Sequence, residues 1–184
     1  PPNLFEIKLS GETIVETTEE KLLGVHVQHD LKWKKHVEKL TSKVNYALLV
    51  LRRLSDQLGK KELKTIADGL VMSKIRYCLT VFAAESLRFH VSDLQSSVVQ
   101  KVQRLQNDML RVITQNRRRD RIRISDMLSS TGFMSVNQTT SYSLLIELWK
   151  AREFNVTVLK DVLERRRDDE RILRSDSASR VYTI

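Results

Sequence analysis

The apolar positions divide this chain into a short N-terminal part with an alternating pattern and a long remainder with a helical pattern. Residues 4–9 alternate apolar and charged side chains, Ser10-Gly11-Glu12 is a turn signal, and residues 21–27 are a second short apolar run. Alternation with a period of two is typical of half-buried strands. The pattern therefore predicts a small antiparallel sheet or hairpin pair over 3–28, which must pack on another part of the protein to be stable.

Apolar residues recur every three or four positions from residue 31 onwards, which is typical of amphipathic helices. The first predicted helix covers 31–54, with Asp30 as its N-cap and Gly59 after its end. The second covers 61–84, and its last turns, from Tyr77, are apolar enough to be deeply buried. A third begins near Ser92, where Gln95 completes a capping box.

The C-terminal half predicts shorter elements. A short helix begins near Ser125, and Ser135 with Gln138 forms a second capping box that opens a further helix. A last helix begins near Thr157. Residues 165–184 are charged and then serine-rich, so we expect this tail to be poorly ordered.

Composition supports a mainly α protein, because the 184 residues include only two prolines and five glycines. The fold class expected is a helical bundle with a small N-terminal antiparallel β hairpin or sheet. Cys78 is the one cysteine, so no internal disulfide is expected, and we interpret it as an inert packed thiol. No apolar run approaches the roughly 20 residues of a membrane span. We therefore expect no membrane contact. The single cysteine favours an intracellular, reducing compartment. Because the sequence starts at Pro1 and not at methionine, we expect it to be a piece of a longer protein.

Basic residues exceed acidic ones by 32 to 23, for a net charge of +9, and this excess favours an anionic partner such as nucleic acid. Two groups of cations are candidate phosphate contacts. The first is a set of lysines on roughly one face of the first helix, and the second is a run of five arginines in seven residues: Lys32, Lys35, Lys39, Lys43, Arg117, Arg118, Arg119, Arg121 and Arg123. The alternatives are a solvated helix face for the lysines, and helix-dipole stabilisation or pairing with Asp120 for the arginines.

Other candidate chemistry is weak. His26 and His29 fall on opposite faces of an extended strand, so no metal site is expected. Asp168-Asp169 lies in an arginine-rich segment and is interpreted as solvated charge. Trp33 and Trp149 lie on apolar stripes and are expected in the core. No serine, cysteine or histidine constellation indicates nucleophilic catalysis, so no catalytic residue and no cofactor is assigned.

Several segments resemble the reverse transcriptases of LINE-type, non-LTR retrotransposons. The first is Leu22-Leu23-Gly24-Val25 followed by Leu31-Lys32-Trp33-Lys34-Lys35-His36-Val37, which is similar to the junction between palm and thumb in that family. Further matches follow in the family's order: Ile75-Arg76-Tyr77-Cys78 to Val81-Phe82, Leu105-Gln106-Asn107 to Leu110-Arg111-Val112-Ile113, Arg119-Asp120-Arg121, Val136-Asn137-Gln138 and Trp149-Lys150. Phe82 stands where the family usually has tryptophan.

The resemblance implies an end-of-palm, primer-grip-like β segment at 1–29 and a thumb-like helical bundle at 30–116. A basic linker with C-terminal helices follows at 117–164, and the tail at 165–184. It assigns Leu22, Leu23, Gly24 and Val25 to the grip, although Gly24 can equally mark a bend in a small sheet.

The chain lacks the aspartate motif that holds the catalytic metal ions in this family. The implied function is therefore non-catalytic binding of template and primer, and this chain alone should have no polymerase activity. Magnesium would bind the absent palm. The implied partners are an RNA–DNA hybrid or other nucleic acid and the upstream palm and fingers, in the nucleus or cytoplasm. The alternative is a domesticated or remnant helical module for protein–protein interaction. A continuous lysine and arginine surface favours the first, and scattered charge with a large apolar patch favours the second.

Overall fold

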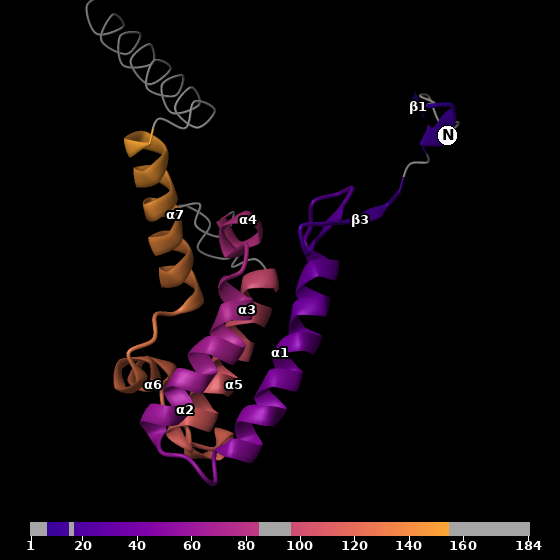
Figure 1. Ribbon diagram of the computed structural model, residues 1–184. Coiled ribbons are helices and arrows are strands. Elements are labelled where there is room, and N and C mark those ends of the chain that lie inside the picture. The colour runs from indigo at the N-terminus through magenta and orange to yellow at the C-terminus, as the bar shows by residue number, and fades with distance from the viewer. Residues whose placement is uncertain (1–6, 15–16, 85–96, 155–184) are drawn as a thin grey trace, which may run out of the picture. The chain divides into compact units, whose positions relative to one another are not determined.

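The computed structural model describes residues 7–14, 17–84 and 97–154, and it is mainly helical with short antiparallel strands near the N-terminus (Figure 1). The predicted fold class is therefore confirmed. The chain divides into two compact units, 1–139 and 140–184, and each is described by itself. The predicted helix starts near Ser92 and Thr157, and the tail at 165–184, lie outside the described residues.

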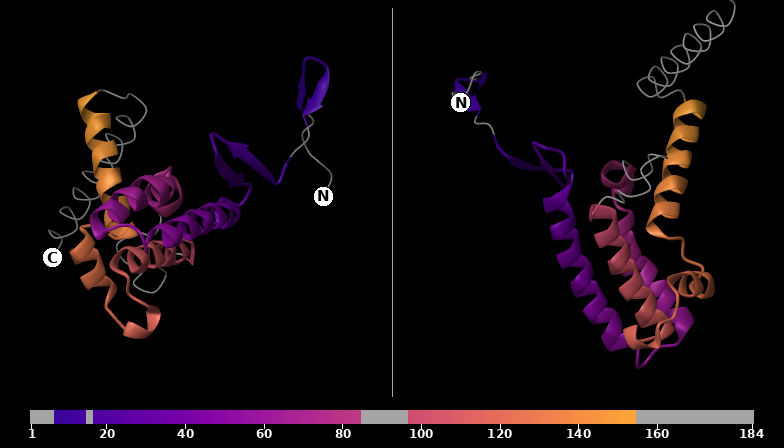
Figure 2. Two further views of the ribbon diagram at one scale, coloured as in Figure 1. Left: turned by 60° about the horizontal axis from the view of Figure 1, so that its bottom comes forward. Right: turned by 180° about the vertical axis from the view of Figure 1, so that it is seen from behind.

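The predicted sheet consists of two separate hairpins (Figure 2). Strands β1 (Ile7–Leu9) and β2 (Glu12–Ile14) form one, and β3 (Glu19–Leu22) and β4 (Val25–Gln28) form the other. In the second hairpin Leu22 pairs with Val25, which leaves Leu23 and Gly24 as a two-residue loop. Both loop residues have positive φ, at 49° and 86°, as a type I′ turn requires.

Helix α1 (Lys34–Leu54) carries the predicted apolar stripe, but both of its predicted end signals are wrong. Trp33, at φ 59°, occupies the N-cap position. Asp30 instead accepts a hydrogen bond from the backbone N–H of Lys32 at 3.2 Å, because its short carboxylate reaches a donor two residues on. Gly59 has an extended backbone and precedes α2 rather than closing α1.

The predicted helix 61–84 is interrupted. It consists of α2 (Lys60–Ala67), the π-helical segment η1 (Asp68–Met72), α3 (Ser73–Arg76) and α4 (Leu79–Ala83). The break falls at Tyr77 and at Cys78, whose φ is 53°. The break turns Tyr77 and Val81 outwards, so that they are about half exposed, at 51% and 54%. The prediction of deep burial over 77–84 is thus wrong at these two positions. It is confirmed at Leu79, Phe82 and Ala83, whereas Cys78, Thr80 and Ala84 are only partly buried.

The core of the first unit lies between α1, the α2–α4 run and α5 (Ser97–Thr114), with Met127 from α6 (Ile124–Thr131) added at one end. The ribbon views show α1, α3 and α5 side by side (Figures 1 and 2). Trp33 packs against this core, as predicted. Trp149 of α7 (Val136–Glu153) is 58% exposed, so its predicted core placement is wrong. No helix in the described part of the chain has the length and apolar character of a membrane span.

A buried polar network joins α5 to the loop before α7. Gln106, fully buried, donates from Nε2 to the carbonyl of Met134 at 2.7 Å and accepts from Gln103 Nε2 at 2.9 Å. Gln103 Oε1 in turn accepts from the backbone N–H of Val136 at 2.9 Å. Gln106 belongs to one of the segments that carry the family resemblance, and its role in this structure is to hold the fold together.

Gln106→Ala should lower the free energy of unfolding by about 1–3 kcal/mol, because it removes the fully buried amide that joins α5 to the loop before α7 and leaves the carbonyl of Met134 without its donor. Urea unfolding followed by circular dichroism measures this. Gln57→Ala, at an exposed loop position, is the control and should change stability by less than about 0.5 kcal/mol. Equal effects of the two variants would contradict the role of the network.

Candidate nucleic-acid interface

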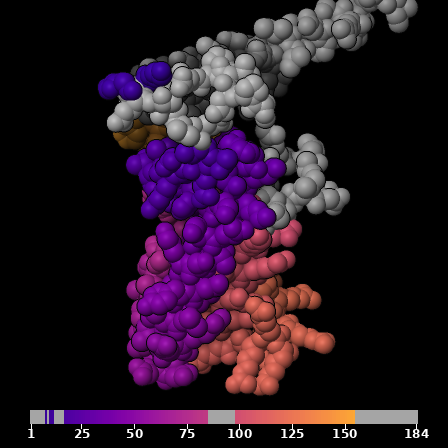
Figure 3. Space-filling view, turned by 90° about the vertical axis from the view of Figure 1, so that its right-hand side faces the viewer, coloured from indigo at the N-terminus to yellow at the C-terminus, as the bar shows by residue number. Residues whose placement is uncertain are grey.

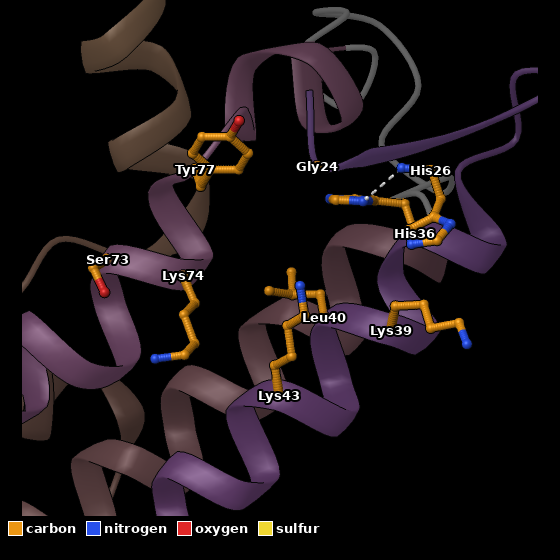
Figure 4. A pocket seen from close by; sticks show the side chains of 9 residues that line it. All are labelled: Gly24, His26, His36, Lys39, Leu40, Lys43, Ser73, Lys74 and Tyr77. Carbon is orange, nitrogen blue, oxygen red and sulfur yellow. Dashed lines mark hydrogen bonds between the residues drawn. The ribbon is translucent and has the colours of Figure 1, made fainter. Parts of the chain in front are cut away.

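A hollow of about 240 Å³ lies between the β3–β4 turn, the first half of α1 and α3 (Figure 4). The hairpin contributes one wall because its strand β4 packs against α1. The residues that line the hollow are Gly24, His26, His36, Lys39, Leu40, Lys43, Ser73, Lys74 and Tyr77.

The lining of this hollow is cationic. Three of the nine residues are lysines and none carries a carboxylate. Lys39 and Lys43 are four residues apart on α1 and therefore project from the same face of the helix. Lys74 comes from α3, where its Nζ donates to the carbonyl of Leu70 at 2.6 Å. Lysines brought together without acidic partners favour a polyanionic ligand.

Two histidines complete one wall. His26 Nδ1 lies 3.0 Å from Glu19 Oε1, and the backbone N–H of His26 donates to His36 Nδ1 at 3.4 Å (Figure 4). The ring of His36 packs against Phe82 with a centroid distance of 5.0 Å. Burial lowers the pKa of His36, and electrostatic interactions with His26 and Lys43 lower the pKa further. His36 is thus neutral at pH 7 and accepts through Nδ1.

The hairpin turn is fixed by Tyr77. Its hydroxyl donates to the carbonyl of Leu23, and its ring lies 3.6 Å from the position of a Cβ added to Gly24. Leu23 itself is 83% exposed and has a left-handed backbone conformation. This conformation costs a residue with a Cβ about 1–2 kcal/mol. The contact with Tyr77 holds this strained turn at the edge of the hollow.

Part of the predicted site is brought together here. Gly24, Lys39 and Lys43 all line the hollow. The side chain of Val25 is buried, whereas Leu22 is 64% exposed, so the four grip-like residues do not share one surface.

Two of the predicted lysines do not line the hollow. Lys35 is exposed on the first turn of α1. Lys32 precedes the helix, and its Nζ pairs with Asp30 Oδ2 at 3.3 Å, so its charge is partly neutralised. Sequence reasoning missed the roles of His36, Lys74 and Tyr77, which reach the hollow from positions that only packing brings together.

The five arginines lie elsewhere, between the end of α5 and the start of α6. Arg118 is bound on both carboxylate oxygens of Asp108, at 3.0 and 3.1 Å. The backbone N–H of Arg117 donates to Asp120 Oδ2 at 2.6 Å. Asp120 thus binds a backbone N–H, and none of the ion pairs in the described part of the chain joins it to an arginine side chain. The side chains of Arg119, Arg121 and Arg123 are exposed.

This arginine segment and the hollow lie near opposite ends of α1. Gln115, just before the arginines, donates to the carbonyl of Ser55 at 3.3 Å, beyond the C-terminus of α1. Ser55 is twelve residues after Lys43, which corresponds to about 18 Å of helix. Figure 3 views the molecule from the side of α1, with the segment after α5 beside the helix.

In comparisons with known proteins, no family model, curated protein or solved structure matches this chain. Within residues 7–14, 17–84 and 97–154, no group of three or more histidine, cysteine, aspartate or glutamate side chains could hold a metal ion. The geometry of the hollow and its charge are therefore the observations from which function is argued.

The free energy of unfolding should fall as the pH decreases below about 6.5, because unfolded His36 takes up a proton there while folded His36 stays neutral to lower pH. Urea unfolding at several pH values measures this. His36→Gln should reduce the pH dependence, and His29→Gln, at an exposed histidine, should not. A pH dependence unchanged in His36→Gln would contradict the assignment.

Leu23→Asn should stabilise the protein by about 1 kcal/mol, because asparagine tolerates the left-handed conformation of a type I′ turn better than leucine. Thermal or urea unfolding measures the change. Leu22→Asn, at an exposed strand position, is the control and should bring no stabilisation. A destabilised Leu23→Asn variant would show that the leucine side chain makes a contact worth more than the strain.

Proposed function

We propose that this chain is the non-catalytic, template–primer-binding thumb portion of an RNA-directed DNA polymerase from a non-LTR retrotransposon. The observation that carries the proposal is the cationic hollow, in which the grip-like turn at Gly24 meets Lys39 and Lys43 of α1. The sequence resemblance also supports the proposal, since it begins at this turn and continues into the start of α1.

In this proposal the hollow receives phosphates of the primer strand. Lysine ammonium groups position a backbone without reading its sequence. A glycine at the turn allows close approach of a partner chain, and the Tyr77 contact keeps the turn in one conformation. An RNA–DNA hybrid suits such a site because its A-like form is recognised by shape and by its backbone.

The distance to the arginine segment is compatible with one duplex. About 18 Å of α1 separates Lys43 from Ser55, which lies beside the start of the arginine segment, so one duplex could contact both groups of cations at phosphates several nucleotides apart. Arg119, Arg121 and Arg123 are the members free to contact phosphate in this proposal, since Arg118 already binds Asp108.

Catalysis belongs to a separate palm in this proposal. Polymerases hold two magnesium ions with palm carboxylates, and the residues of this chain bind and orient the primer beside them. The upstream palm and fingers are thus the expected protein partners, and the nucleus or cytoplasm the expected compartment.

The second candidate is a helical protein–protein interaction module. It is favoured by exposed apolar side chains at the hairpin tip and beside it, where Leu22, Leu23 and Tyr77 are 64%, 83% and 51% exposed. An apolar patch of this kind also suits contact with an upstream palm, so nucleic-acid binding is the property that separates the two candidates.

Lys39→Ala/Lys43→Ala should weaken binding to an RNA–DNA hybrid. The slope of log affinity against log salt concentration should become less steep by about two, since each phosphate contact contributes about 0.9 to that slope. Fluorescence anisotropy over a salt series measures this. The matched control is Lys101→Ala/Arg104→Ala, which removes the same charge from exposed positions of α5. Lys32→Ala should change little because Lys32 is paired with Asp30.

Two results would overturn the proposal. Equal losses in the hollow variant and in the control variant would show that binding follows net charge alone. No binding of the hybrid by the unmodified chain near physiological salt would favour the interaction module.

A further inference from the structure

A second cationic concavity lies between α2 and the end of α6, near the end of α1 opposite the first hollow. Two hollows of about 280 and 520 Å³ share Lys61 and Lys64 in their walls and are therefore neighbours. Together they are called the groove. The first hollow is also lined by Lys60, Ile113, Thr114, Ser130 and Thr131, and the second by Thr65, Asp68, Arg76, Gly132 and Phe133.

The cations of this groove outnumber its acids. Lys60, Lys61 and Lys64 are exposed, and none of the ion pairs in the described part of the chain involves them. Asp68 is the one carboxylate in the lining, and it is paired with Arg76 at 2.8 Å. Three ammonium groups thus face a concave surface without an acidic partner.

Lys64 is held at the middle of the groove. Its Nζ lies 5.7 Å from the ring centroid of Phe133 and 3.4 Å from the position of a Cβ added to Gly132. An ammonium within about 6 Å of an aromatic face is attracted by the ring. Phe133 is 8% exposed, so it positions the lysine and offers no face on which a base could stack.

The hydroxyl groups of the groove are already used as donors. Thr114 Oγ1 donates to the carbonyl of Leu110, and Ser130 and Thr131 both donate to the carbonyl of Met127. A small anion would therefore find the lysine ammonium groups but no hydroxyl donor free to complete a cradle around it. A ligand that contacts several cations in succession suits the groove better.

The arginine segment lies close to this groove in the chain. Arg117 follows Thr114 by three residues, a reach of at most about 10 Å. Arg123 directly precedes α6, whose eight residues span about 12 Å up to Thr131. Both ends of the arginine segment thus lie within roughly 12 Å of a residue that lines the groove.

We infer that this groove binds the phosphodiester backbone of a single nucleic-acid strand, at a site separate from the hollow beside Gly24. A flexible single strand can follow a narrow, positively charged groove of this kind, because such a groove tracks the backbone without reading the bases. With lysines as the donors, binding is tolerant of sequence and depends on salt. The inference does not depend on the hollow binding a template–primer duplex.

The test is anisotropy of the full chain with a fluorescent ten-nucleotide oligothymidylate over a salt series. Lys60→Ala/Lys61→Ala/Lys64→Ala should flatten the salt slope by about two, because each single-strand contact contributes about 0.7. The matched control, Lys34→Ala/Lys101→Ala/Arg104→Ala, removes three charges from exposed positions that do not line the groove and should leave the slope nearly unchanged. All the substituted side chains are exposed, so the variants should keep the wild-type circular dichroism spectrum.

If the groove and the hollow are separate sites, substitutions in each should reduce affinity for its own ligand only. The triple variant should keep its affinity for an RNA–DNA hybrid within about twofold, while Lys39→Ala/Lys43→Ala should keep its affinity for the single strand.

Three outcomes would overturn the inference. The first is equal losses in the triple variant and its control. The second is a triple variant that loses hybrid binding as strongly as Lys39→Ala/Lys43→Ala, which would indicate one shared site. The third is displacement of the oligonucleotide by an equally long oligoglutamate at equal concentration, which would indicate an acidic protein as the partner.

Discussion

The apolar face of α1 packs against α5 and against the run from α2 to α4, and the positions of all the charged groups discussed above depend on this packing. Seven residues on one side of α1 are buried, and burial of a large apolar side chain contributes about 1.5–3 kcal/mol. With that face fixed, the remaining faces of α1 must point to solvent or to the hairpin. Lys39 and Lys43 are held at the edge of a hollow because their neighbour Leu40 is in the core.

The contact between Tyr77 and the β3–β4 turn shows how a local irregularity can serve a site. The π-helical segment and the break at Cys78 interrupt what the sequence pattern describes as one helix. The interruption frees Tyr77 from the core, and its hydroxyl then reaches the carbonyl of Leu23 across 54 positions of sequence. A left-handed leucine persists because surrounding contacts hold it, which is common where a turn has a functional role.

The cations assigned to ligand binding form two groups near the two ends of α1, and ion pairs remove some basic residues from each group. Asp30 and Asp108 neutralise Lys32 and Arg118, while Lys39, Lys43, Lys60, Lys61 and Lys64 have no such partner among the described ion pairs. Exposed ion pairs contribute little to stability, but they decide which cations remain available to a phosphate. An exposed apolar hairpin tip adds a surface suited to a protein neighbour.

The sequence by itself determined the fold class, the stripe of α1, the capping box of Ser135 and Gln138 at 2.9 and 3.3 Å, and two of the lysines that line the hollow. These follow from local periodicity and from contacts three or four residues apart, which the order of residues specifies directly. The tertiary structure alone decided that Lys74 and Tyr77 meet Gly24, that Asp30 binds Lys32 instead of capping α1, and that Lys64 lies over Phe133. Such pairings depend on packing between distant segments and on competition among several nearby donors, and neither leaves a periodic signal in the sequence.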